Sequence, residues 1–221
     1  MATNTYLTMQ QRIADEFINT AVTNAHIKNA IQSAIAYYEI TPLYFNQKQA
    51  TFNTIASREY YDATDLADIP DIGHIRSAVV ALNGIKNPLY QAEFNDIDAA
   101  QSGVMIGFPY NYAIYSRKLR LFPIPDAAYP ITLSYVTLLP ALVNDTDTNG
   151  WMVEGEAVIR QRAKRILALD ILYSDEMAMR CKSLEDEEFE SLMDETRART
   201  ASTSLKYPQI MPTRSFNIYQ G

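Results

Sequence analysis

Residues 110–151 constrain the fold most, because strand patterns there give way to a helix pattern across a series of prolines. Residues 112–115 and 118–122 have the composition of two strands, and the second alternates in the way typical of a half-buried strand: Leu119 and Leu121 against Arg120 and Phe122. Prolines cannot donate the backbone hydrogen bonds that pair strands. Pro123, Pro125 and Pro130 should therefore end this strand and shape the connection to the next one. Residues 131–139 then resume the alternation. The stretch predicts strands that end shortly before a helix.

Helix patterns flank this region on both sides. Residues 8–20, with Thr8 as the N-cap, and residues 23–40 form two amphipathic patterns, and two longer ones cover 153–173 and 177–199. Helices at both ends of a chain can pack together while strands project from them. The sequence therefore predicts an α+β fold: a helical bundle of N- and C-terminal helices, with a β-rich insertion over about 48–139.

More strands are expected early in the insertion. Short strands are predicted at 50–52 and 59–61, and a helix at 92–101. Asn83-Gly84, between apolar residues 75–82 and 85–90, is the strongest short signal for a β-hairpin.

The order of these elements is distinctive. The phrase AIYSRKLRLFPIPDAAYPITLSY is followed by Leu138-Leu139-Pro140, a DTDTN turn and a long helix. Over about residues 8–200 this order resembles the head-to-tail adaptor (connector, or head-completion) proteins of tailed bacteriophages. The resemblance implies a structural protein of the virion neck, made in the host cytoplasm, with no enzymatic activity and no cofactor. It also implies a ring of twelve copies that binds the portal protein, extends the DNA channel and docks tail or neck proteins.

Composition agrees with that expectation. The chain has 221 residues, 48% of them hydrophobic, and a formal net charge of −7. An acidic protein lacks the basic surface of a dedicated DNA-binding protein, so double-stranded DNA should pass through without specific binding. The longest apolar run, residues 166–173, contains Asp170 and is far too short to cross a membrane.

The last segment differs from the rest. We expect an adaptor body at residues 1–201 and an extended arm at 202–221, which has no acidic residue and two prolines. Such a segment cannot close a core of its own, so its anchors should bind a partner, the portal. The alternative is a tail without a partner. The proposed anchors are Leu205, Lys206, Tyr207, Ile210, Met211, Arg214, Phe216, Ile218 and Tyr219.

One turn matches the pattern of an EF-hand loop, D-x-D-x-N-G-x5-E. Its candidate calcium ligands are Asp145, Asp147, Asn149 and Glu156. An EF-hand needs a helix before the loop, whereas a predicted strand and Pro140 precede this one. We therefore interpret the residues as a turn that caps its own backbone and the next helix, with no metal, and calcium binding as the alternative.

Two other functions remain open. Glu154 or Glu156 with Asp147 would supply the paired carboxylates of a peptidoglycan hydrolase. A tail-completion protein is the second alternative, although the long helices at both ends favour the adaptor.

The remaining polar residues show no catalytic pattern. His26, His74 and Cys181 each stand alone in the sequence. The acidic run at 185–195 is interpreted as a solvated helix face paired with Arg197 and Arg199. Alternatively, the run lines a pore or meets basic residues of a neighbouring subunit, for which Arg160, Arg162, Lys164 and Arg165 are the candidates.

Overall fold

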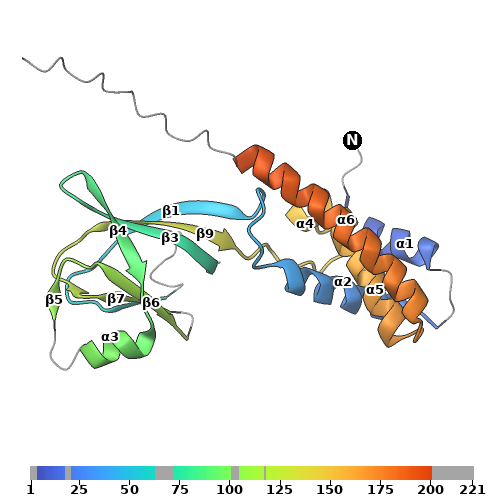
Figure 1. Ribbon diagram of the computed structural model, residues 1–221, viewed down its shortest axis with the longest axis horizontal. Coiled ribbons are helices and arrows are strands. Elements are labelled where there is room, and N and C mark those ends of the chain that lie inside the picture. Colours follow the sequence, from blue (N-terminus) through green and yellow to red (C-terminus); the bar gives the residue numbers. More distant parts are fainter. Residues whose placement is uncertain (1–3, 18–20, 63–71, 101–104, 117, 201–221) are drawn as a thin grey trace, which may run out of the picture.

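The computed structural model describes residues 4–17, 21–62, 72–100, 105–116 and 118–200. The strands, with helix α3 (Phe94–Ala100), lie at one end of an elongated molecule, and the other helices lie at the opposite end (Figure 1). The mixed α+β class expected from the sequence is confirmed.

Five of the helices lie together at one end. They are α1 (Tyr6–Glu16), α2 (Asn24–Tyr38), α4 (Gly150–Val153), α5 (Glu156–Asp170) and α6 (Asp175–Thr200). Helix α5 contacts α1, α2, α4 and α6, so helices from both ends of the chain share one hydrophobic core. Its fully buried members include Ile13, Ile31, Trp151, Ile159 and Leu167.

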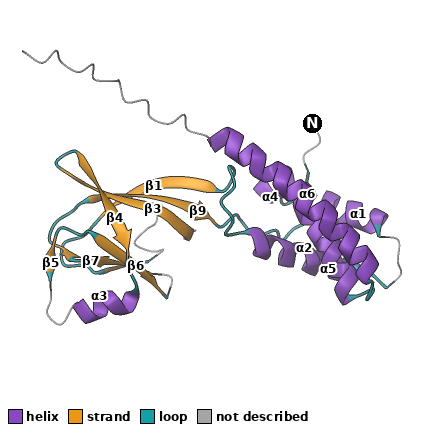
Figure 2. Cartoon of the chain, viewed as in Figure 1, coloured by secondary structure: helices purple, strands orange, loops and turns teal. Residues whose placement is uncertain are grey.

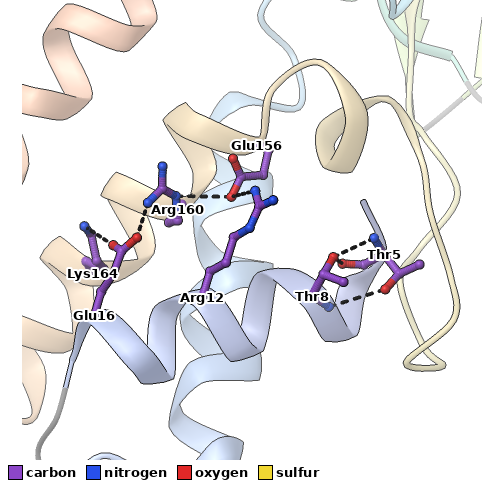
Figure 3. A network of polar contacts seen from close by, with 7 residues as sticks. All are labelled: Thr5, Thr8, Arg12, Glu16, Glu156, Arg160 and Lys164. Atoms are coloured by element: carbon purple, nitrogen blue, oxygen red, sulfur yellow. Dashed lines mark hydrogen bonds and ion pairs between the residues drawn. The ribbon is translucent and has the colours of Figure 1, made fainter. Parts of the chain in front are cut away.

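Helix α1 begins three residues earlier than expected. Thr5, not Thr8, is the N-cap: the Thr8 N–H donates to Thr5 Oγ1 (3.3 Å) and the Thr5 N–H donates to Thr8 Oγ1 (2.8 Å). Two threonines three residues apart satisfy each other's backbone donors in a capping box, and the first of them takes the cap position. Figure 3 shows both bonds. The expected continuation at 18–20 lies outside the described residues.

The helix expected over 153–173 is α5, which starts three residues later and ends three residues earlier; the short helix α4 precedes it, and Gly155 separates the two. A Cβ atom on Gly155 would lie 2.8 Å from Cε3 of Trp151, which is 1% exposed. The buried indole therefore packs against the backbone so closely that the chain turns there.

Seven strands form the main sheet at the other end. They are β1 (Gln47–Asn53), β2 (Tyr60–Tyr61), β3 (Ile72–Leu82), β4 (Ile85–Gln91), β6 (Asn111–Tyr115), β7 (Lys118–Phe122) and β9 (Pro130–Thr137), in the order β1-β9-β3-β4-β6-β7-β2. Within this sheet the described pairs are antiparallel except β4–β6, which is parallel. Strands β5 (Ile106–Gly107) and β8 (Ile124–Pro125) pair separately. The expected β-rich region is thus confirmed, and it has a second core built around Val80, Leu121, Ile131 and Leu133.

The β3–β4 hairpin confirms the Asn83-Gly84 prediction. Asn83 (φ 50°) and Gly84 (φ 80°) both occupy the left-handed region that a two-residue type I′ turn requires. Leu82 and Ile85 are directly paired across the turn.

Strand β7 is buried on both faces, which corrects the half-buried expectation. Leu119 and Leu121 face the sheet core, while α3 (Phe94–Ala100) covers the opposite face (Figure 2). On that face Phe122 packs with Ile97, and Arg120 binds Glu59 and Asp98. The alternation of Leu with Arg and Phe predicts one solvent-exposed face. The sequence pattern of the strand does not reveal that α3 covers this face.

Candidate assembly surfaces

The turn at 143–149 joins the strands to the helices and caps α1. The Tyr6 N–H donates to the Asp147 carbonyl (2.9 Å) and the Leu7 N–H to the Asp145 carbonyl (2.9 Å). The first N–H groups of a helix have no partner inside the helix, so these carbonyls satisfy them. The turn therefore fixes the N-terminal helix to the segment that leads into α4.

The two aspartates of this turn have separate structural partners. Asp145 Oδ1 accepts from Lys28 Nζ (2.9 Å) and Gln10 Nε2 (3.4 Å). Asp147 Oδ2 accepts from the backbone N–H groups of Asn144 (2.7 Å) and Val143 (2.8 Å). The side-chain hydrogen bonds from Lys28 and Gln10 lower the pKa of Asp145, and the backbone hydrogen bonds lower the pKa of Asp147.

The other two candidate calcium ligands point to further partners. Asn149 Oδ1 caps α4 by accepting from the N–H groups of Trp151 (3.0 Å) and Met152 (3.3 Å). Glu156 Oε1 pairs with Arg12 (3.3 Å) and Arg160 (3.1 Å). Across the described ranges, no group of three or more His, Cys, Asp or Glu side chains is placed to hold a metal ion.

The three acids of the hydrolase interpretation likewise serve different elements. Glu154 Oε2 accepts from the Tyr44 hydroxyl (2.6 Å), whereas Glu156 faces Arg12 and Arg160 and Asp147 binds its own turn. Each carboxylate is thus engaged in a contact that supports the fold.

The lone histidines and cysteine also have ordinary structural surroundings. His26 Nδ1 accepts from the Thr23 N–H in the capping box of α2, and His74 lies exposed on β3. Cys181 is buried in α6, and burial raises the pKa of its thiol, which disfavours the reactive thiolate.

A polar network fastens α1 to α5 (Figure 3). Glu16 accepts from Lys164 Nζ (2.6 Å) and from Arg160 Nη1, and Arg160 also faces Glu156. Two of the basic residues assigned in one interpretation to a neighbouring subunit therefore pair within the chain.

The charge of Glu16 should stabilise the fold in a pH-dependent way. Burial alone would raise the pKa of Glu16, but the hydrogen bonds and charges of Lys164 and Arg160 outweigh it and lower that pKa. A lowered folded-state pKa means that the stabilisation is present above the unfolded pKa of about 4.3 and is lost as the pH falls through the folded pKa. Because Glu16 is partly exposed, we expect Glu16→Gln to cost only about 0.5–1 kcal/mol at pH 7.

Urea unfolding at pH 7 and pH 3 measures this effect. The difference between Glu16→Gln and the unmodified protein should be smaller at pH 3 than at pH 7, because Glu16 loses its charge as the pH falls through its folded-state pKa. Glu190→Gln, at an exposed position on α6, is the control and should change little at either pH. A constant difference at both pH values would contradict the role assigned to the charge.

Glu185 is a second polar hub, and it joins three helices. Its Oε1 accepts from the Tyr38 hydroxyl of α2 (2.6 Å) and from Arg162 of α5 (2.8 Å), and its Oε2 accepts from Arg165 (3.3 Å). The Glu185 side chain is only 2% exposed. Burial and the hydrogen bond to Glu185 raise the pKa of Tyr38 well above its usual value.

The acidic run containing Glu185 was therefore interpreted only partly correctly. The pairs Arg197–Asp194 (2.7 Å) and Arg199–Glu195 (2.5 Å) confirm the solvated helix face. Glu185 is the exception, and its cations come from α5 of the same chain.

Apolar side chains that the fold leaves exposed form the candidate assembly surfaces. One group lies where α5 meets α6: Leu169, Tyr173, Met177, Met179 and Leu184. Others lie on the strand-rich end: Leu82 and Ile85 flank the β3–β4 turn, and Tyr90, Ile114 and Tyr115 lie on β4 and β6 away from that turn.

Sequence reasoning missed these surfaces, although α6 contains a signal for one of them. Ala178, Cys181 and Glu185 follow the spacing of a buried stripe. Met177 and Leu184 are seven residues apart and so share a neighbouring face of the helix, outside that stripe. The proposed anchors at 202–221 lie outside the described residues.

Comparison with known families finds one match. Residues 4–208 match the model of a family described as SU10 adaptor protein. A comparison with curated proteins finds no match. No helix within the described part of the chain is long and apolar enough to span a membrane.

Proposed function

Since this chain belongs to the SU10 adaptor protein family, a family of structural bacteriophage proteins, we propose that it is a head-to-tail adaptor in the neck of a tailed-phage virion. The observation that carries the proposal is the extent of the match, which includes the helices of both ends and the strands between them. The work of such a protein is mechanical: it joins other virion proteins.

We further propose that twelve copies form a ring beneath the portal and extend its DNA channel. The helices that share the α1–α6 core act in this ring as one bundle, held together by Glu16 and Glu185. The exposed apolar side chains at the α5–α6 corner supply contact area for neighbours or portal. Such rings use head-to-tail contacts that close by rotation.

Portal attachment is assigned to the arm at 202–221, and the body to residues 1–201. The arm carries two basic residues, Lys206 and Arg214, and no acidic one, so it suits a portal surface that carries acids. The net charge of −7 on the whole chain disfavours close contact with phosphates, so DNA should slide through the ring without binding it.

Mass photometry of the purified protein, alone and with the portal of the same phage, tests this function. We expect monomers or weak oligomers alone, and a discrete increase in portal mass equal to one ring when the two are mixed. Ordering of the arm on a partner couples assembly to portal binding. Binding to isolated tail proteins without any binding to portal would instead indicate a tail-completion protein and overturn the proposal.

A further inference from the structure

We propose that the tip of the β3–β4 hairpin of one copy docks in a pocket beside α3 of a second copy. This inference rests on the proposed ring, and it names one contact through which neighbouring copies would join.

Two exposed apolar side chains flank the turn of the hairpin. Leu82 and Ile85 face each other across the Asn83-Gly84 turn and are 38% and 67% exposed. Directly paired residues lie on the same face of a hairpin, so both side chains present one apolar surface. Figure 1 shows the hairpin projecting beyond the neighbouring strands. Turns usually carry polar residues next to water, so an apolar pair at a projecting tip is suited to insertion into a partner.

The pocket is lined by apolar and acidic side chains. It has a volume of about 510 Å³ and is formed by Gln91, Ala92, Glu93, Phe94 and Ile114. Pockets of this size accommodate groups as large as small ligands. The Phe94 ring stacks on that of Tyr115, with centroids 4.2 Å apart, and Ile114 is exposed.

The walls of this pocket are held in place by the sheet. Tyr90 and Gln91 pair in parallel with β6, and the Ala92 N–H donates to the Tyr112 carbonyl (2.8 Å). The backbone on this side of the pocket is therefore fixed by the sheet.

The tip and the pocket lie at opposite ends of β4. The strand runs from Ile85 at the turn to Gln91 at the pocket, a separation of about 20 Å at roughly 3.3 Å per residue. A rigid strand of this length keeps the tip out of its own pocket. A tip can thus reach the pocket of another copy only, and such a contact between two different surfaces propagates around a ring.

Charge complementarity favours a second copy as the occupant. Lys86 follows Ile85 at the tip, and Glu93 lines the pocket. With the apolar tip inserted, these opposite charges would lie at the rim of the contact and fix its orientation.

Cysteine crosslinking tests the contact on the full chain. The variant Ile85→Cys/Ile114→Cys places one thiol at the tip and one at the pocket, while the native Cys181 is buried. Treatment of the concentrated protein, mixed with portal, with a short bismaleimide should give a ladder of trimers and larger species, because each copy is linked on two sides. Either single-cysteine variant should stop at dimers. A double variant that also stops at dimers overturns the proposal.

Charge reversal in the double-cysteine background gives a second readout. Lys86→Glu and Glu93→Lys should each reduce the ladder by about two- to fivefold, and the two together should restore it. Lys48→Glu, an exposed position on β1, is the matched control and should leave the yield unchanged. If the yield of trimers and larger species stays the same in all of these variants, the hairpin contact is overturned. If the protein saturates the portal but gives no ladder, the hairpin contact is wrong and the proposed function stands. If it gives a ladder but does not bind portal, the proposed function is wrong and the hairpin contact stands.

Discussion

Replacing Glu185 with alanine should lower the free energy of unfolding by about 3 kcal/mol, and the melting temperature by about 6–12 °C. The reason is that the Glu185 carboxylate is buried and is the shared partner of three side chains. Alanine would leave the Tyr38 hydroxyl without its acceptor and would leave the guanidinium groups of Arg162 and Arg165 facing each other across an empty site. Removing one member of a buried ionic group costs more than the group as a whole contributes, because the remaining charges stay poorly solvated.

Urea and thermal unfolding followed by helical circular dichroism would measure this loss. Glu187→Ala, exposed two residues further along α6, is the matched control and should stay within about 0.5 kcal/mol of the unmodified protein. Glu185→Gln keeps the shape but removes the charge, so its loss should fall between the two. Equal stability of Glu185→Ala and Glu187→Ala would show that the hub does not hold the helices together.

The strand pattern was the most predictable part of the fold. Asn83-Gly84 requires two positive φ angles, and local turn chemistry alone selects the hairpin. The pairing of β1 with β9, some eighty residues apart, follows from no local pattern, because any strand with the same alternation fits the same edge. Local signals thus located the strands without ordering them in the sheet.

The interpretation of Glu185 failed for a reason that the sequence does contain. Charge alone placed it with its acidic neighbours on a solvated face, yet it falls four residues after the buried Cys181. Spacing on a helix decides which face a residue occupies, and a buried acid is stable once cations reach it from a neighbouring helix. Arg162 and Arg165 supply those cations, but which helix packs beside α6 becomes evident only in three dimensions.

The candidate sites also differ in how far the local sequence predicts them. The turn at 145–149 is explained by local chemistry, because Asp147 and Asn149 bind backbone groups within a few residues. The pocket beside α3 combines residues of β4, α3 and β6, so no local sequence pattern predicts it.

Deleting residues 202–221 should reduce affinity for the portal by at least about 100-fold while leaving the body folded. Helix α6 is described to Thr200, and the core side chains of the described residues all precede residue 202, so the truncation keeps them. Tyr207, Phe216 and Tyr219 are the expected hot spots, because buried aromatic side chains dominate interface energies. Two such anchors at about 2 kcal/mol each already account for the predicted loss.

Co-sedimentation with portal over a concentration series gives the affinity, and circular dichroism confirms that the truncated protein keeps its helices. A full-length variant in which Tyr207, Phe216 and Tyr219 are replaced by alanine should reproduce most of the loss. Its matched control replaces Ser202, Thr203 and Gln209 of the same segment and should bind normally. If the truncated protein saturates the portal at unchanged affinity, attachment belongs to the helical body, and the exposed apolar residues at the α5–α6 corner become the surface through which the adaptor holds the portal.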